Sequence, residues 1–247
     1  MSSASPRSSG LGRVIDLWRL FRREKTDPEP FYRALAAEAV SDLEERHGPF
    51  TGRRILDMGC GPGFYTDAFR ARGAEVVPID NDPTEMAMVG DPPEGAIVAD
   101  AGALPLEDRS FDGVFCSNLL EHTPQPDPVI EEMQRLLKPG GWGYVSWTNW
   151  WSPWGGHDMT PWHYLGPRLG PRLYEHFKGL PRKNPYGAGL WARHVGPTVR
   201  LVRSQPLLQV DRVEPRYWPR LAFICDVPLL RELATWNCVI RVTRKPG

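Results

Sequence analysis

Residues 55–66, ILDMGCGPGFYT, place a glycine-rich turn directly after a short apolar run. Residues 54–57 predict a strand, and a helix is expected to begin near Phe64. The glycines between them stand at every second position, at Gly59, Gly61 and Gly63. Glycine permits a positive φ and lets the backbone approach a ligand that a Cβ atom would keep away. The stretch therefore predicts a ligand-binding turn between a strand and a helix.

Strands and helices alternate along the chain around this turn. Beyond the first strand, the pattern predicts strands at 75–80, 95–100, 111–118 and 142–147, and helices at 64–73, 83–90 and 127–141. Such alternation indicates right-handed βαβ units and a parallel sheet that helices cover on both faces. The strands are almost continuously apolar, which agrees with burial on both faces. We interpret residues 49–147 as the ligand-binding core of an α/β domain.

The chain changes character after Trp147. Six of its ten tryptophans fall within residues 142–162, among glycines and prolines that interrupt regular structure. We expect residues 148–192 to form a loop-like insert that covers a substrate. Residues 193–247 are expected to complete the same sheet, with helices at 194–206 and 227–234 and closing strands at 207–218 and 236–245.

Two helices are expected before the core. Residues 11–24 carry an apolar stripe beside several arginines, so this helix either packs on its own domain or makes a weak peripheral contact with anionic lipid at the inner face of the membrane. Residues 31–48 predict a second helix that ends at Gly48. Together residues 11–48 form the expected N-terminal helical cover, after a tail at 1–10 that we expect to be disordered.

Composition limits the class of protein. The chain has 247 residues, 41% of them hydrophobic, which suits one globular domain with a sizeable core. The start lacks the apolar stretch of a secretory signal, and no apolar run approaches the roughly 18 residues of a membrane-spanning helix. The cysteines are far apart, with no CxxC pair and no zinc-like grouping with histidine, at Cys60, Cys116, Cys225 and Cys238. We therefore expect a cytoplasmic protein with reduced thiols and no metal.

Charge is unevenly distributed although the formal net charge is zero. Residues 26–160 hold 23 acidic and nine basic side chains, whereas residues 161–247 hold five acidic and 15 basic ones. Either these parts complement each other within one domain, or the basic part attracts an anionic substrate or a membrane surface. The sequence leaves both interpretations open, and it leaves the oligomeric state open as well.

Polar residues stand at the ends of the expected strands, namely Asp57, Asp80, Asp100 and the pair Ser117–Asn118. Open parallel sheets bind ligands beyond the carboxyl ends of their strands. A dinucleotide site needs the spacing G-x-G-x-x-G, but here the turn reads G-x-G-x-G and position 64 is Phe. A P-loop needs Gly-Lys-Ser/Thr, which does not follow this turn.

The remaining pattern favours a ligand with an amino-acid end, a ribose and a base, and without a pyrophosphate. The helix start after the turn offers backbone N–H groups to a carboxylate. Asp57 can accept hydrogen bonds from the turn or from an ammonium group, and Asp80 can accept both hydroxyls of a ribose. S-adenosylmethionine fits this description.

At this point the chain resembles class I S-adenosylmethionine-dependent methyltransferases, in particular the branch that includes the ubiquinone and menaquinone biosynthesis enzymes. Four stretches between about residues 54 and 147 carry the resemblance: ILDMGCGPG, VVPIDND, IVADAGALPLEDRSFDGVFCSNLLEHT and EMQRLLKPGG. The resemblance implies a Rossmann-like α/β fold, with a seven-stranded mostly parallel sheet whose last strand is antiparallel. It also implies that residues 49–147 bind the cofactor.

The resemblance assigns a role to each matching residue. Gly59, Gly61 and Gly63 would lie against the methionine part of the cofactor, and Asp57 would orient their loop. Asp80 and Asn81 would hold the ribose, while Asp100 and the Ala101 backbone would contact the adenine. Ser117 and Asn118 would border the methionine end. Tyr65 and, with less support, Tyr32 would cover the cofactor.

Methyl transfer to a hydroxyl needs a general base, and histidine titrates closest to neutral pH. His122 follows the fourth strand, where the fold brings it near the methyl end, although the pair Glu121–His122 could instead cap the next helix. His157 lies in the insert, where Asp158 could orient its imidazole. His163 is expected to pack among tryptophans.

We therefore predict a methyltransferase that acts on a small-molecule or lipid- or glycan-linked acceptor, with oxygen as the methylated atom and His122 or His157 as the base. The alternatives are C-methylation of a quinone- or polyketide-like acceptor and a non-catalytic S-adenosylmethionine-binding protein. Nucleic acid is not expected as a substrate. The Asn/Asp-Pro-Pro-aromatic motif of base-methylating enzymes would follow the fourth strand, where this chain has CSNLLEH, and the stretch NPYG at 184–187 lies elsewhere.

Overall fold

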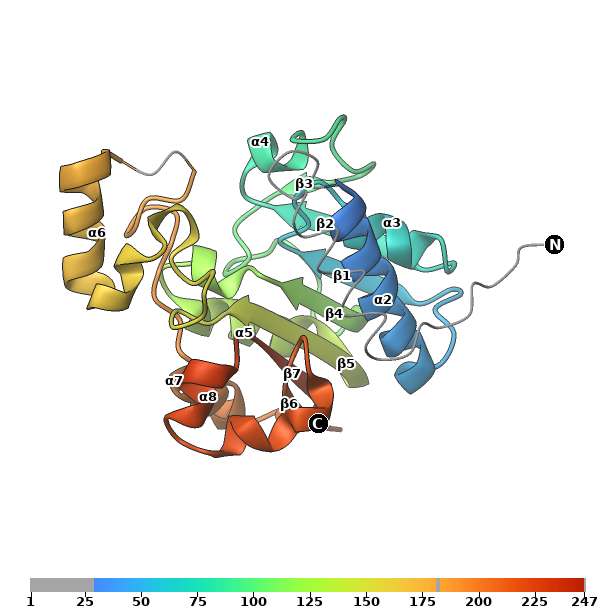
Figure 1. Ribbon diagram of the computed structural model, residues 1–247. Coiled ribbons are helices and arrows are strands. Elements are labelled where there is room, and N and C mark those ends of the chain that lie inside the picture. Colours follow the sequence, from blue (N-terminus) through green and yellow to red (C-terminus); the bar gives the residue numbers. More distant parts are fainter. Residues whose placement is uncertain (1–28, 181–182, 247) are drawn as a thin grey trace.

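The computed structural model describes residues 29–180 and 183–246 (Figure 1). The expected tail at 1–10 and the amphipathic helix at 11–24 lie outside these residues. Within them, no helix is long and apolar enough to cross a membrane.

A seven-stranded sheet forms the centre of the molecule, in the order β3-β2-β1-β4-β5-β7-β6. Its strands are β1 (Arg54–Met58), β2 (Glu75–Asp80), β3 (Ile97–Val98), β4 (Phe111–Ser117), β5 (Leu137–Thr148), β6 (Leu208–Pro215) and β7 (Asn237–Arg244). The first five strands pair in parallel, while β7 runs antiparallel to both β5 and β6. The predicted Rossmann-like, mostly parallel sheet with an antiparallel last strand is thus confirmed.

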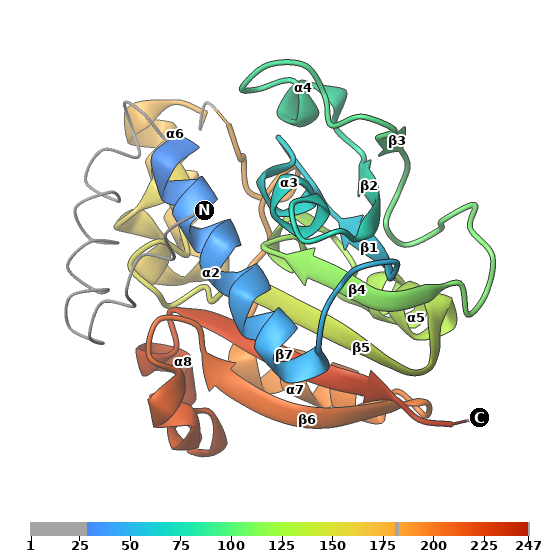
Figure 2. The same cartoon turned by 90° about the vertical axis from the view of Figure 1, so that its right-hand side faces the viewer.

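Helices cover both faces of this sheet, as Figure 2 shows from the side. One face carries α2 (Glu29–His47) and α3 (Phe64–Arg70), and the other carries α5 (Pro126–Leu136) and α7 (Val195–Ser204). The shorter helices are α4 (Pro83–Met86), α8 (Leu230–Ala234) and the 3-10 helices η1 (Leu120–His122), η2 (His157–Met159), η3 (Trp162–Leu165) and η4 (Pro219–Asp226). This arrangement explains the apolar central strands, because neither face of β1 or β4 is open to water.

Side-chain alternation fills two cores from the same strands. Ile55 and Phe115 pack with Phe69 of α3 on one face, whereas Leu56 points to the face where Met133 of α5 lies. Because successive strand residues point to opposite faces, nearly every position of β1 and β4 is buried. These buried strands fix the place of the loops at their carboxyl ends.

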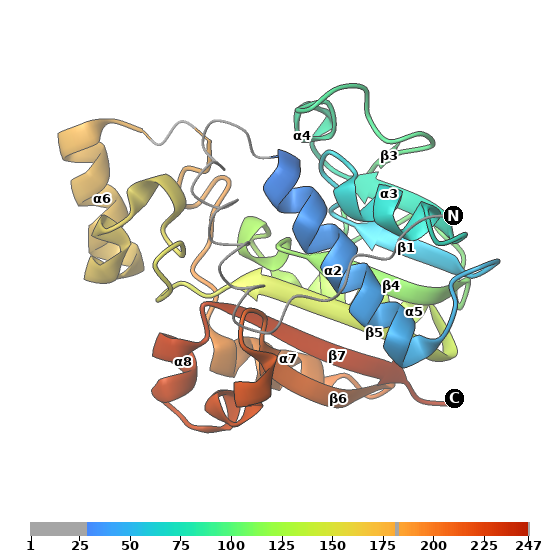
Figure 3. The same ribbon diagram turned by 45° about the vertical axis from the view of Figure 1, so that its right-hand side comes forward.

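The expectation that residues 148–192 are loop-like throughout is wrong for one part. Residues Gly166–Lys178 form α6, which stands away from the sheet in Figures 1 and 3. Pro167 occupies the first turn, where a missing N–H group costs nothing, and Pro171 lies inside the helix. The sequence GPRLGPRL suggests breaks, but its first proline starts a helix. The last predicted helix of the core is also shorter than expected, because β5 already begins at Leu137.

Candidate active site

The order of the strands reverses between β1 and β4, which lie side by side at the centre of the sheet. β1 leads to β2 on one side, whereas β4 leads to β5 on the other. The loops that leave Met58 and Ser117 therefore diverge and leave room for a ligand between them. This is the place where the glycine turn lies.

The turn adopts the conformation that its glycines predict. Gly59, Gly61 and Gly63 have φ angles of 78°, 48° and 84°. The N–H group of Gly59 donates to the Ile79 carbonyl oxygen at 2.8 Å, and that of Gly61 donates to Asp80 Oδ2 at 2.9 Å. A Cβ atom on Gly63 would lie 2.4 Å from Pro93, whereas one on Gly61 would meet nothing within 4 Å. Gly63 is thus required by packing, while Gly61 faces open space.

Asp57 lies behind the turn and is 1% exposed. Its Oδ2 accepts a 2.6 Å hydrogen bond from the hydroxyl of Thr66, inside α3. Burial raises the pKa of Asp57 to about 7, and the nearby charge of Asp80 adds to the effect, although the Thr66 bond opposes it. Asp57 therefore fastens the end of β1 to the helix that follows the turn, in keeping with its predicted role of orienting the loop.

The other predicted cofactor carboxylates lie at strand ends and reach solvent. Asp80 accepts from the Gly61 and Asp82 N–H groups, and exposed Asp100 accepts from the Gly102 N–H group at 2.8 Å through one oxygen. A carboxylate offers about four acceptor sites, so both retain capacity for a ligand. Each residue thus shapes its own turn and still presents acceptors. Asn81 is exposed beside Asp80, and Ala101 is buried beside Asp100.

The end of β4 is joined to distant parts of the chain. The Ser117 hydroxyl lies 3.0 Å from the Ser146 hydroxyl, and Asn118, at a φ of 55°, accepts a 2.8 Å hydrogen bond from Asn237. Arg216 donates to the Ser117 hydroxyl at 3.1 Å and to the Tyr65 hydroxyl. Sequence reasoning missed Arg216, because it lies far along the chain in no recognisable motif.

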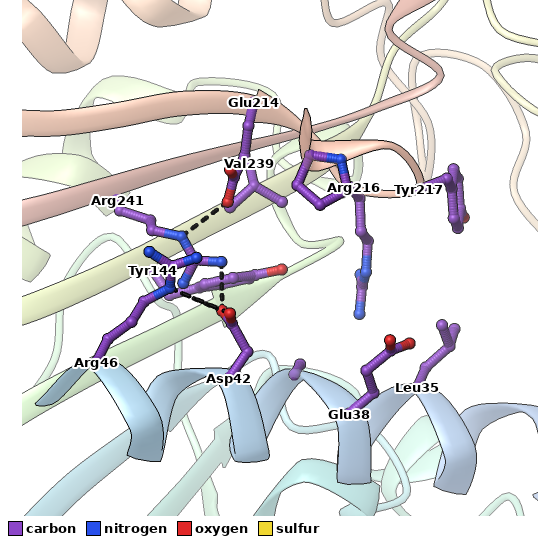
Figure 4. Close-up of a pocket in the computed structure, with 12 residues that line it drawn as sticks. Leu35, Glu38, Asp42, Arg46, Tyr144, Glu214, Arg216, Tyr217, Val239 and Arg241 are labelled. Carbon is purple, nitrogen blue, oxygen red and sulfur yellow. Dashed lines mark hydrogen bonds and ion pairs between the residues drawn. The ribbon is translucent and has the colours of Figure 1, made fainter. Parts of the chain in front are cut away.

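Arg216 also lines a pocket of about 130 Å³ between α2 and strands β5 to β7 (Figure 4). Two other arginines of this pocket are paired with acids: Arg241 with Asp42 at 2.6 Å and with Glu214 at 2.9 Å, and Arg46 with Asp42 at 3.1 Å. Arg216 makes no ion pair with any residue of the described part of the chain. The pocket thus carries a cation whose hydrogen-bond partners are neutral hydroxyls.

Tyr32 of α2 stacks on Phe64 at the start of α3, with ring centroids 5.9 Å apart.

The two predicted catalytic histidines meet at the carboxyl end of β4. His122 of η1 and His157 of η2 have ring centroids 5.1 Å apart at an interplanar angle of 87°. His122 Nδ1 lies 2.7 Å from the Gly189 carbonyl oxygen, so Nδ1 carries the proton and Nε2 keeps its lone pair. Glu121 lies beside them, and its Oε1 accepts a 2.9 Å hydrogen bond from the Thr148 N–H group. Sequence reasoning considered Glu121 only as a cap.

His157 is held by a partner other than the one expected. Its Nδ1 faces the amide nitrogen of Asn184 at 3.4 Å, while Asp158 is exposed and makes no hydrogen bond to it. The expectation that Asp158 orients the imidazole is wrong, because Asn184 rather than Asp158 lies at Nδ1 of His157 within the described residues. Burial, His122 and Lys183 lower the pKa of His157 to about 3. His163 is buried against Trp150, as expected, and its Nε2 lies 3.0 Å from the Ser152 carbonyl oxygen.

The fold and the glycine turn define the class of protein. A structure from Mesorhizobium loti described as an S-adenosylmethionine-dependent methyltransferase superposes with a TM-score of 0.57 at 23% identity, covering 83% of this chain and 96% of that one. The [4+2]-cyclase SpnF superposes with a TM-score of 0.53 at 18% identity, covering 85% and 82%. These likenesses show the fold of class I methyltransferases, and the second shows that this fold also hosts another reaction.

Sequence relatives decide the family. The family described as "Methyltransferase domain" matches residues 56–145. An uncharacterized methyltransferase of Mycobacterium ulcerans is 38% identical over 244 residues, covering 95% of each chain, and one of Mycobacteroides abscessus is 38% identical over 243 residues, covering 93% of each. The chain therefore belongs to the methyltransferase family, and its cofactor is S-adenosylmethionine. The resemblance to the ubiquinone and menaquinone branch stays a prediction.

The residues where the strand order reverses, between β1 and β4, fit this cofactor. The open space before Gly61 admits a ligand close to the backbone, and the N–H groups at the start of α3 can meet a carboxylate. Asp80 and Asp100 offer acceptors for hydroxyl and amino groups at the ends of β2 and β3. The individual contacts that we assigned from the sequence stay predictions.

Proposed function

We propose that this protein transfers the methyl group of S-adenosylmethionine to a hydroxyl oxygen of a small or lipid- or glycan-linked acceptor. The observation that carries the proposal is the meeting of His122 and His157 beyond the carboxyl end of β4. These residues are far apart in sequence, yet their rings lie against each other, and the carboxyl ends of the strands are the edge at which such a sheet binds its ligands. A paired set of imidazoles at this edge suits the activation of a hydroxyl.

The transfer is an in-line displacement at the methyl carbon. The acceptor oxygen forms a bond to that carbon, the carbon–sulfur bond breaks, and S-adenosylhomocysteine leaves as a neutral thioether. In the simplest mechanism, the hydroxyl proton passes to Nε2 of His122, and the Gly189 carbonyl oxygen accepts a hydrogen bond from Nδ1 of the same ring. Burial keeps His157 neutral, so it serves better to position the acceptor than to store a proton.

The pocket under α2 supports the choice of acceptor. Arg216 presents a cation there that forms no ion pair with a carboxylate of the described residues, and Tyr65, Tyr144 and Tyr217 lie near it. An aromatic wall with one cation suits an acceptor that combines a ring or glycan with an acidic or phenolic group.

A lipid-linked acceptor is supported by the outer surface of the substrate cover. On and beside α6, large apolar side chains are exposed: Leu165, Leu169, Phe177 and Leu180. The basic residues Arg168 and Arg172 stand among them on the same helix. Apolar and basic side chains together favour contact with an anionic lipid surface. Peripheral contact at α6, with or without residues 11–24, is part of the proposal.

The test is a transfer assay with labelled S-adenosylmethionine against hydroxyl-bearing phenols, glycosides and lipid-linked sugars. We expect an O-methylated product whose formation falls at least 100-fold in His122→Gln, with unchanged affinity for the cofactor. Products methylated only on carbon would support the quinone- or polyketide-like acceptor instead. Tight cofactor binding without product from any acceptor would support a non-catalytic binding protein.

A further inference from the structure

Glu121, His122 and His157 form a compact cluster of three potential metal ligands. One donor atom from each lies within 4.8 Å of the donor atoms of the other two. Even so, no hydrogen bond or ion pair joins the three side chains to one another anywhere in the described structure. Their donor atoms therefore converge on a shared space without satisfying each other.

Two of these donors are buried and have no partner among the described residues. Glu121 is 1% exposed, and neither its Oε2 nor Nε2 of His157 forms a hydrogen bond within that part of the chain. No lysine or arginine of the described residues forms an ion pair with this carboxylate, although the charge of Arg193 acts on it from a longer distance. Burying a carboxylate oxygen without a donor or a cation is costly, so an unpaired one calls for an explanation.

The backbone at His157 adds to this observation. His157 has a φ of 47°, a region that residues other than glycine rarely adopt. In this conformation the imidazole of His157 lies against the imidazole of His122. A strained residue that aims a side chain into a polar cluster is typical of a functional site.

We propose that the Glu121–His122–His157 cluster binds a divalent transition-metal ion of the zinc class. The ligands are Oε2 of Glu121 and the Nε2 atoms of both histidines. Two imidazoles and a carboxylate form a donor set that such ions prefer, and three protein ligands leave a position open for water or for an acceptor oxygen. The expectation from sequence that the chain has no metal did not consider this set, because His157 lies 35 positions after His122.

The surroundings hold each ligand in a suitable form. The Thr148 N–H group binds Oε1 of Glu121, which leaves Oε2 for the ion. The Gly189 carbonyl oxygen accepts the proton on Nδ1 of His122, which leaves Nε2 unprotonated. Outer partners of this kind orient metal ligands and fix the tautomer of histidine.

Asn184 supplies the corresponding partner of His157. Its amide nitrogen lies 3.4 Å from Nδ1, an arrangement in which the proton resides on Nε2. Metal binding moves this proton to Nδ1, so we expect the amide to rotate and accept it through Oδ1. The stretch NPYG, which sequence analysis set aside as unrelated to base methylation, thereby gains a role through its first residue.

The metal site does not depend on which acceptor is methylated. An ion on Nε2 of His122 occupies the lone pair that would otherwise take a proton, so the two roles of His122 exclude each other. In that case the ion lowers the pKa of an oxygen bound at the open position, as it does for bound water. This consequence for hydroxyl activation rests on the proposed function, whereas binding of the ion does not.

The experiment uses the full chain without a histidine tag, freed of metal with a chelator and titrated with Co²⁺ and then Zn²⁺. We expect uptake of one ion per chain, visible absorption bands of Co²⁺ with nitrogen and oxygen ligands, and their loss on adding Zn²⁺. Glu121→Gln and His157→Gln should each weaken Co²⁺ binding more than 100-fold. Asn184→Ala, which removes only an outer partner, should weaken it about 10- to 100-fold.

The control variant is His176→Gln, because His176 is an exposed histidine of α6 outside the cluster. It should bind Co²⁺ as the unaltered chain does. Affinity for S-adenosylmethionine, measured on every variant, reports whether the fold is intact. Glu121→Gln keeps an acceptor for the Thr148 N–H group, and His157→Gln changes a different segment of the chain. If one of these variants fails to fold, the other still tests metal binding.

The proposal would be overturned if the unaltered chain did not bind one ion per chain. Co²⁺ binding that persists in both cluster variants would overturn it as well. Neither result concerns methyl transfer, which the labelled-methyl assay measures separately.

Discussion

The backbone N–H group of Gly61 donates a 2.9 Å hydrogen bond to Oδ2 of Asp80, which ties the glycine turn after β1 to the end of β2. The same carboxylate accepts from the Asp82 N–H group at 3.0 Å. Asp80 therefore holds the turn in shape, and we expect it also to present an acceptor to the cofactor. A change at this residue should affect both roles.

Asp80→Ala should bind S-adenosylmethionine at least thirtyfold more weakly, because the variant loses the proposed ribose contacts and the fixed turn. The loss of two charge-assisted hydrogen bonds should reduce the binding free energy by roughly 2–4 kcal/mol. Calorimetric titration of the cofactor and of S-adenosylhomocysteine measures the change. Asp91→Ala, at an exposed position between α4 and β3, is the control and should bind as the unaltered chain does. Equal affinities in both variants would contradict the ribose assignment.

Gly61→Ala and Gly63→Ala should separate cofactor binding from folding. Both positions have a positive φ, which costs a residue with a side chain roughly 1–2 kcal/mol. At Gly63 the new Cβ atom also meets Pro93 at 2.4 Å, so thermal unfolding should occur at a clearly lower temperature. At Gly61 the Cβ atom meets no protein atom, so the chain should remain folded but lose at least tenfold in cofactor affinity. A Gly61→Ala variant with full affinity would show that the cofactor does not approach this side of the turn.

Asp57→Asn should stabilise the cofactor-free protein at high pH only. The pKa of Asp57 is raised to about 7 in the folded state, chiefly by burial, so the folded state favours the protonated form. Stability from this group is present below the pKa of the unfolded chain, near 4, and is lost as pH rises through about 7. The variant should therefore match the unaltered protein at pH 4 and exceed it at pH 8 by up to about 4 kcal/mol.

Denaturant unfolding at several pH values measures this difference. Thr66→Val is the companion variant, since it removes the hydroxyl that opposes protonation of Asp57. Its penalty should grow with pH. A pH-independent gap between Asp57→Asn and the unaltered chain would contradict the assignment.

Arg216→Met should weaken binding of an acidic or phenolic acceptor more than binding of the cofactor. The guanidinium bridges the Ser117 and Tyr65 hydroxyls and lines the pocket under α2. Once an acceptor is known, the KM for that acceptor should rise at least tenfold while cofactor affinity changes little. Arg220→Met, at an exposed position of η4, serves as the control. If the cofactor affinity falls instead, Arg216 binds the carboxylate of the cofactor.

Vesicle co-sedimentation tests the proposed contact with lipid. The full chain should sediment with anionic vesicles and remain in solution with neutral ones. Replacing Leu169 and Phe177 of α6 by glutamate should release it, and a version that starts at Asp27 shows how much residues 11–24 contribute. Equal recovery of all versions in the supernatant would remove the membrane from the proposal.

Local patterns predicted the cofactor end of the site. Asp57, Asp80 and Asp100 could be selected because each stands at or near the carboxyl end of a strand, and the glycine turn because its conformation depends on the glycines themselves. The acceptor end of the site was harder to predict from the sequence. His122 and His157 could be selected as histidines near the right edge of the sheet, but Glu121 and Arg216 were not recognised as parts of the site.

The difference has a physical cause. Continuously apolar strands, helix ends and positive-φ glycines act over a few residues, so the sequence by itself determined the strands of the core, the helices between them and the glycine turn. The cluster at His122 depends instead on how residues 148–180 and 183–192 lie at the end of β4, where Gly189 and Asn184 meet the two histidines. Packing between segments far apart in the chain leaves no period in the sequence. Only the tertiary structure could bring these side chains together.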